Sequence, residues 1–280
     1  MKNIIDAITT LIKRNCFDLT DLIAGNNRAN SRGDALEIYV KNLFADTFNC
    51  SATDRLEKWN ETFSWLGNSS NPPDFMFKGG DAVEVKKIEA PDTALALNSS
   101  YPKHTLKSSS PLISNACREA EAWEEKEIIY VVGVVNGNKL KHLCMIYGQD
   151  YCASDEYYNR IRQLIKGGVE TIPFVNFAPT RELGRVNRVD PLGITYLRIR
   201  GMWHIENPWR VFDYVYQRNF RAEFNFMCLI NLEKWKRLKN YKDVIKLQES
   251  YPSLKIVDVK LKDPDNPAKL KAVKLIQYET

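Results

Sequence analysis

Long hydrophobic runs are absent from this sequence. No stretch of its 280 residues approaches the roughly 18 consecutive apolar residues that a membrane-spanning helix needs. The N-terminus, from Met1 to Asp6, has an acidic side chain early and no apolar run of the kind found in a signal peptide. We therefore expect a cytoplasmic protein with no membrane partner.

Metal-binding cysteine pairs and nucleotide-binding loops are missing as well. The three histidines and six cysteines include no Cys-x-x-Cys pair, which argues against a zinc site and a disulfide framework. His142, Cys144 and Cys152 fit buried side chains beside a strand better than a metal site. No glycine-rich phosphate loop is present, which argues against a nucleotide-driven motor or a dinucleotide-dependent enzyme.

The pattern that is present indicates an α/β protein with a mixed central β-sheet flanked by helices. We expect one domain over residues 1–280, since this length can bury a substantial core. Helices are predicted over residues 2–14, 31–47, 114–126, 155–166 and about 233–247. Strands are predicted over a hairpin at 74–89 and over 128–135, 140–147, 194–199, 227–232, 254–261 and 272–278. Residues 90–112 show no clear period and are expected to form a long loop.

The hairpin carries the most informative motif of the chain. Pro73-Asp74 is followed, after nine residues, by Glu84-Val85-Lys86, and the Lys-Gly-Gly-Asp turn at 78–81 lies between them. Side chains alternate faces along a strand, so Glu84 and Lys86 point to one face and Val85 to the other. Asp74, on the partner strand, is expected near Glu84. Two adjacent carboxylates suit a hard divalent cation such as Mg²⁺.

Two other acid-x-Lys triplets lack this context. Glu124-Glu125-Lys126 lies in the charged run 119–127, which we interpret as a solvated helix face, and Asp258-Val259-Lys260 has no Pro-Asp nearby. A simpler interpretation of the hairpin motif also stands, namely a surface hairpin with an incidental Glu–Lys ion pair.

These residues provide the parts for metal-assisted phosphodiester hydrolysis. Asp74 and Glu84 would bind the metal, and the Val85 carbonyl could add a neutral ligand. Lys86 would orient or deprotonate the attacking water and offset phosphate charge, and burial beside cations would lower its pKa.

Two nearby residues are less certain by pattern. Glu37 could be an outer or second-metal ligand, although a solvated helix glutamate explains it equally well. Lys87 points to the opposite face, so it is expected to be structural or a remote contact to the DNA backbone.

The net charge of +5 is compatible with a nucleic-acid partner, and its distribution is more informative. Residues 181–200 hold five arginines, and residues 234–246 hold six Lys and Arg side chains. Such clusters form phosphate-binding surfaces, although a solvated helix face explains the second cluster equally well.

Several strings resemble those of NgoPII-type type II restriction endonucleases, and the hairpin resembles the catalytic core of the PD-(D/E)xK nuclease superfamily. The resemblance rests on Gly25–Asn30, Gly33–Glu37, Asn71–Asp74, Gly79–Glu89 and Ala94–Pro102. It implies Mg²⁺-dependent double-strand cleavage of DNA at a short palindrome such as GGCC. It also assigns metal binding to Asp74 and Glu84, and the catalytic lysine to Lys86.

Further expectations follow from that resemblance. The catalytic core would cover about residues 31–150, with DNA-recognition elements at about 90–112 and 180–250. A palindrome is matched most simply by a homodimer, in which each subunit cuts one strand. The functional partner would be a cognate DNA methyltransferase in a prokaryotic cytoplasm.

Base-reading residues follow from DNA chemistry. Arginine reads guanine O6 and N7 in the major groove, so Arg181, Arg185 and Arg188 are the first candidates. Asn98, Ser99 and Tyr101 could contact the backbone or a base edge, or could simply cap a loop.

Two alternatives remain open. A DNA repair or transposition nuclease of the same fold would cut without a fixed sequence. A non-catalytic DNA-binding protein would show salt-sensitive binding without hydrolysis, although a pure binder has no need of clustered carboxylates facing a polyanion.

Overall fold

The computed structural model describes residues 2–22, 28–68 and 71–280. Residues 25–27 of the string Gly25–Asn30 lie outside this described part. The helices are α1 (Ile4–Arg14), η1 (Thr20–Leu22), α2 (Arg28–Ala45), α3 (Ala52–Thr62), α4 (Asn115–Glu119), α5 (Gly148–Tyr151), α6 (Asp155–Glu170), α7 (Pro208–Val211), α8 (Leu232–Arg237) and α9 (Tyr241–Ser250). The strands are β1 (Phe63–Trp65), β2 (Phe75–Phe77), β3 (Ala82–Ile88), β4 (Leu95–Asn98), β5 (Thr105–Lys107), β6 (Glu125–Asn136), β7 (Lys139–Tyr147), β8 (Gly184–Asn187), β9 (Tyr196–Ile199), β10 (Trp203–Ile205), β11 (Asn225–Asn231), β12 (Lys255–Lys262) and β13 (Leu270–Glu279).

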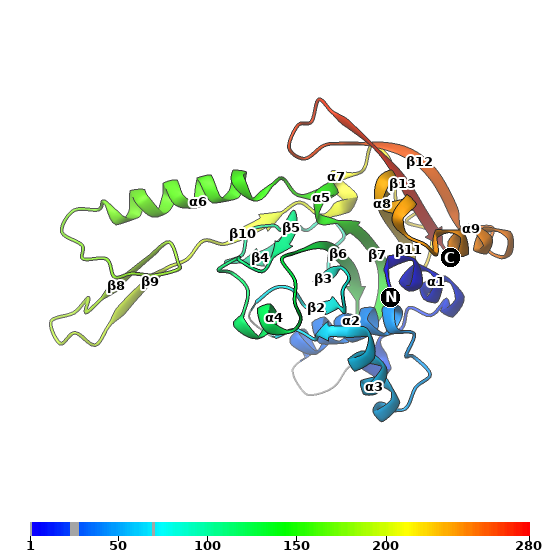
Figure 1. The fold of residues 1–280 in the computed structure, drawn as a ribbon, viewed down its shortest axis with the longest axis horizontal. Coiled ribbons are helices and arrows are strands. Elements are labelled where there is room, and N and C mark those ends of the chain that lie inside the picture. Colours follow the sequence, from blue (N-terminus) through cyan, green and yellow to red (C-terminus); the bar gives the residue numbers. More distant parts are fainter. Residues whose placement is uncertain (1, 23–27, 69–70) are drawn as a thin grey trace.

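A mixed sheet in the order β1-β2-β3-β6-β7-β11-β13-β12 forms the centre of the molecule, and β5 adds to β6. The β3–β6 and β7–β11 pairs are parallel and the other pairs of the sheet are antiparallel. Helices flank this sheet (Figure 1), which confirms the predicted mixed α/β class with a central mixed sheet flanked by helices.

Each face of the sheet buries its own apolar cluster. Helix α2 packs on the first face through Leu36, Tyr39, Val40, Leu43 and Phe44, which recur at the 3.6-residue period of a helix. Helix α1 covers the same face, and its N-terminus is capped by the Asn3 side chain, which accepts from the Ile5 amide at 2.8 Å. The second cluster contains Ala82 and Ile88 from β3 and Val132 from β6. Side chains at alternate positions of β3 therefore face opposite cores.

The predicted helix over 114–126 is wrong beyond its first turns, because α4 ends at Glu119 and β6 begins at Glu125. Lys126 is buried rather than solvated, and it pairs with Glu121 at 2.5 Å. Its ammonium also donates to the Gly80 carbonyl at 2.6 Å, which ties β6 to the hairpin turn. These tertiary hydrogen bonds override the helical preference of the charged run.

Residues 90–112 are not a simple loop, because they contain β4 and β5. Strand β4 pairs with β10, and β5 pairs with the start of β6. Strands this short leave little periodic signal, and their partners lie elsewhere in the sequence. The predicted basic helix at 233–247 is also two helices, α8 and α9.

Residues 155–202, which we call the arm, project from the sheet-containing body as α6 and the β8–β9 hairpin (Figure 1). Gly184 is the only buried residue in this range. The arm therefore has almost no core of its own. No helix in the described ranges is long and apolar enough to span a membrane.

Candidate active site

The β2–β3 hairpin holds Asp74 beside β3, as the sequence predicted. The Asp74 amide donates to the Val83 carbonyl at 3.0 Å, and the Asp74 carboxylate accepts from the Val85 amide at 2.6 Å. Both bonds are made by backbone groups of β3. The position of Asp74 is therefore set by the register of the hairpin.

Strand alternation separates the polar side chains of β3 from its valines. Val83 and Val85 pack against the first core, whereas Glu84 and Lys86 line a cleft. Glu84 lies opposite Tyr130 of the parallel neighbour β6. The Lys86 ammonium lies 2.5 Å from Glu84 Oε1, so the Glu–Lys pair exists, but it lies in the cleft rather than on a plain surface.

The Asp74 and Glu84 carboxylates interact electrostatically in a buried site. Burial and the neighbouring Glu84 carboxylate raise the pKa of Asp74 well above its ordinary value, although Lys86 opposes this shift. Glu84 Oε2 is buried and has no hydrogen-bond partner among the described residues. A buried carboxylate oxygen without a donor is the environment that a bound cation would satisfy.

The protonation of Lys86 differs from the sequence-based expectation. Burial alone would lower the pKa of Lys86, but the carboxylates of Glu84 and Asp74 outweigh it, and the pKa is raised. Beside these carboxylates Lys86 is an ammonium ion, which can donate hydrogen bonds and offset negative charge.

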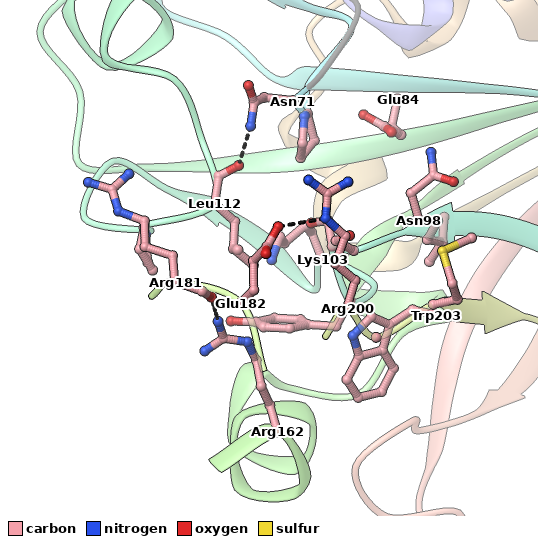
Figure 2. A pocket seen from close by; sticks show the side chains of 18 of the residues that line it. Asn71, Glu84, Asn98, Lys103, Leu112, Arg162, Arg181, Glu182, Arg200 and Trp203 are labelled. Carbon is pink, nitrogen blue, oxygen red and sulfur yellow. Dashed lines mark hydrogen bonds and ion pairs between the residues drawn. The ribbon is translucent and has the colours of Figure 1, made fainter. Parts of the chain in front are cut away.

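The cleft has a volume of about 890 Å³ and lies between the body and the arm (Figure 2). The hairpin contributes Asp74, Glu84 and Lys86 to one wall. The end of β4, the segment that follows it and the arm contribute Asn98, Ser99, Tyr101, Lys103, Arg162, Arg181 and Arg200. Acidic and basic groups thus meet in one cavity, which suits a polyanionic substrate that is also approached by a cation.

The predicted DNA-contacting residues divide into two groups. Asn98, Ser99, Tyr101 and Arg181 line the cleft. Arg185 and Arg188 lie farther along the arm and are not among its lining residues. The Arg185 side chain donates instead to Asn187 at 2.9 Å.

Two further candidates are also outside the lining of the cleft. Lys87 points away from it, as alternation predicted, and pairs with Glu89 at 3.0 Å. Glu37 pairs with Lys41 at 2.6 Å, although its charge still raises the pKa of Asp74. The described residues contain no cluster of three or more His, Cys, Asp or Glu placed to hold a metal.

Sequence reasoning missed Arg162, Arg200 and Lys103 as residues of the cleft. Arg200 belonged to the arginine cluster, but it pairs with Glu182, which also binds Arg198 at 2.6 Å. Arg162 lies on α6, and it donates to the Arg181 carbonyl across the arm. Lys103 follows Tyr101 closely in sequence, and that proximity was the available signal.

Comparisons with known proteins identify the family of this chain. Residues 2–262 match the NgoPII restriction endonuclease family. A curated relative, the type II restriction enzyme NgoPII of Neisseria gonorrhoeae, is 54% identical over 277 residues, which cover 99% of each chain. No solved structure matches the chain. A family match over nearly the whole length, together with this identity, shows that the chain belongs to the NgoPII restriction endonuclease family and is a type II restriction endonuclease.

Proposed function

We propose that this restriction endonuclease makes Mg²⁺-dependent double-strand cuts at a short palindromic, GGCC-like DNA site, with Asp74, Glu84 and Lys86 as its catalytic residues. The observation that carries this proposal is the pair of adjacent carboxylates, one with a buried oxygen that has no hydrogen-bond partner among the described residues. They lie in a cleft whose lining also includes the basic residues Lys86, Lys103, Arg162, Arg181 and Arg200. A site of this composition is expected of a PD-(D/E)xK nuclease core.

The residues present fit a magnesium ion. Mg²⁺ is commonly held by one or two carboxylates, with waters and substrate phosphate as the other ligands, so Asp74 and Glu84 suffice. The Val85 carbonyl would add a neutral ligand, and Glu37, which pairs with Lys41 outside the lining of the cleft, would act at most through the outer shell. When bound, the ion would supply Lewis-acid activation of water and relief of phosphate charge.

Each protein group then has a defined role. Asp74 is held by the Val85 amide, so its second oxygen is oriented by the strand. Glu84 fixes the Lys86 ammonium at 2.5 Å, where that ammonium can orient the attacking water and offset charge on the phosphate. We further propose that residues 1–280 form one nuclease domain with its catalytic core at about 31–150.

DNA recognition is assigned to the elements at about 90–112 and 180–250. Asn98, Ser99, Tyr101 and Arg181 line the cleft and are the nearest candidates for contacts to bases or phosphates. Arg185 and Arg188 would reach DNA farther along the arm. Lys87 would make at most a remote backbone contact.

The direct test is digestion of unmodified plasmid DNA in Mg²⁺ or in EDTA, followed by run-off sequencing of the fragments. We expect discrete fragments in Mg²⁺, none in EDTA, and a single palindromic site at every fragment end. Smeared products without a fixed site would favour the repair or transposition alternative. Salt-sensitive binding without cleavage of any DNA would refute the nuclease proposal in favour of a binding protein.

We also propose that the enzyme is a homodimer and that the arm pairs with a second copy. Of the 18 large hydrophobic residues exposed in the described part of the chain, 12 lie in the arm, among them Leu164, Phe174 and Leu192. The helix and hairpin of the arm leave these side chains exposed, and an extended exposed apolar surface marks an interaction site. DNA phosphates cannot cover apolar side chains, whereas an identical arm can, and a second copy also brings the second active site that a double-strand cut requires.

Oligomeric state in solution tests this surface. The arm, residues 155–202, is long enough to supply the 20–30 or so residues that each partner contributes to a standard interface. Wild-type protein should sediment at twice the 32.3 kDa chain mass, and Leu164→Glu should shift it towards the monomer. Leu56→Glu is the matched control, because Leu56 is 55% exposed on α3 outside the arm. A wild-type monomer, with and without DNA, or equal effects of the two variants, contradicts this interface.

A cognate DNA methyltransferase is the functional partner that this activity needs, since an unprotected host genome would be cut. Both enzymes would work in the prokaryotic cytoplasm, where the DNA lies. A methyltransferase gene beside this one, whose product blocks digestion, is the expected finding.

A further inference from the structure

Lys103 is a buried cation without a hydrogen-bond acceptor. Its side chain lies in the cleft (Figure 2), and the residue is only 3% exposed. Its amide donates to the Tyr130 hydroxyl at 2.7 Å, which fixes the backbone beside β6. Its ammonium lies 3.5 Å from the centre of the Tyr101 ring. No acceptor for that ammonium is found among the residues that the structure describes.

The other buried lysines of the described chain are all paired. Lys41 lies 2.6 Å from Glu37, Lys126 lies 2.5 Å from Glu121, and Lys234 lies 2.8 Å from Asp81. These three therefore have a structural explanation. Lys103 differs from them in having only an aromatic ring against its charge.

Such an arrangement is costly without an anionic partner, because an ammonium loses its hydration and gains only a cation–π contact. Burial lowers the pKa of Lys103 to about 8, although the carboxylates of Asp155 and Glu84 oppose that shift from a distance. Asp155 Oδ1 also lacks a partner, so a water-bridged Lys103–Asp155 pair is the structural alternative. Lys103 and Glu84 line the same cleft.

We propose that Lys103 is a second catalytic lysine, which contacts the phosphate that is cleaved at the Asp74–Glu84 site. Lys86 is held by Glu84, so Lys103 is the ammonium of the cleft that remains available to a non-bridging phosphate oxygen. It stabilises the charge that develops on that phosphate during attack by water. This role rests on the proposed nuclease function. Tyr101 would then act as a positioning residue, because its ring holds the Lys103 ammonium through a cation–π contact.

The test compares Lys103→Met and Lys103→Arg with Lys78→Met, a control at an exposed lysine on the hairpin turn. The substrate is a duplex that carries the site identified for the wild-type enzyme. We expect Lys103→Met to lower single-turnover cleavage by about 10²–10³-fold, and Lys103→Arg to retain part of the activity. Binding of the same duplex is also measured without Mg²⁺ at several salt concentrations. The slope of the logarithm of the binding constant against the logarithm of the salt concentration should fall by about one unit in magnitude in Lys103→Met only.

The Tm of Lys103→Met distinguishes a phosphate-binding role of Lys103 from a structural role. We expect it to rise if Lys103 binds phosphate and to fall if Lys103 stabilises the fold. Met removes an unpaired buried charge but keeps the volume, so the Tm of Lys103→Met should rise by a few degrees. A lower Tm that Asp155→Asn reproduces, or wild-type cleavage with an unchanged salt slope, would overturn the proposal. If the wild-type enzyme cuts no DNA, the proposed function fails instead, and the salt slope on a random-sequence duplex still decides whether Lys103 binds phosphate.

Discussion

Lys86→Ala should reduce cleavage by at least about 10³-fold while DNA binding in the absence of Mg²⁺ stays within a few-fold of wild type. The Lys86 ammonium lies 2.5 Å from Glu84 in the cleft, where it can orient water and offset phosphate charge. Alanine removes both effects but leaves the arginines of the arm, to which we assign the attraction to DNA. Single-turnover cleavage and equilibrium binding on one duplex measure the two properties separately.

Lys87→Ala is the matched control for this experiment. Lys87 is the next residue of the same strand, but it points away from the cleft and pairs with the exposed Glu89. The Lys87→Ala variant should therefore cleave DNA at nearly the wild-type rate. Equal activity of Lys86→Ala and Lys87→Ala would remove the assigned active site, and thermal melting of both proteins would exclude unfolding as the cause of any loss.

The largest expected effect on stability belongs to Lys234. This lysine lies 2.8 Å from Asp81, also pairs with Glu127, and has a side chain that is only 9% exposed. Lys234→Met would remove the lysine from Asp81 and from Glu127, which also pairs with the exposed Arg237 at 3.1 Å, in a poorly solvated site. Removing one member of a buried ionic group costs about 3 kcal/mol or more, so the free energy of unfolding should fall by that amount.

Lys236→Met is the control, because Lys236 is exposed on the same helix, α8. Its unfolding free energy should change by less than about 0.5 kcal/mol. Urea denaturation of both variants measures the difference, and DNA affinity should be unchanged in Lys234→Met. If Lys234→Met instead loses DNA affinity with unchanged stability, Lys234 belongs to the phosphate-binding surface that the basic cluster at 234–246 predicted.

Local patterns were sufficient to predict the β2–β3 hairpin and the face of α2. The hairpin combines a glycine turn with strict alternation, so one strand segment determines that Glu84 and Lys86 share a face. Helix α2 buries the apolar residues that its 3.6-residue period places together. In both cases the decisive contacts are made by neighbours in sequence or by one adjacent strand.

Local sequence patterns could not distinguish solvated lysines from lysines in buried ionic groups. Lys126 appeared to be part of a solvated helix, and Lys234 part of a basic cluster, yet both are buried ionic groups. The partner of Lys234 at Asp81 is 153 residues away in sequence. No local period reports a contact over that separation, since the pairing depends on how β3, β6 and α8 pack.

The sequence by itself determined the family, the mixed α/β class and the Asp74, Glu84 and Lys86 cluster, because strand alternation and distinctive strings are local properties. Only the tertiary structure decided which basic side chains belong to the cleft. It brings Lys103 and the arm residues Arg162, Arg181 and Arg200 to the same cavity as the hairpin, while Lys126 and Lys234 are used within the body. The physical reason is that charge is fixed by residue type, whereas its hydration and its partners are set by long-range packing.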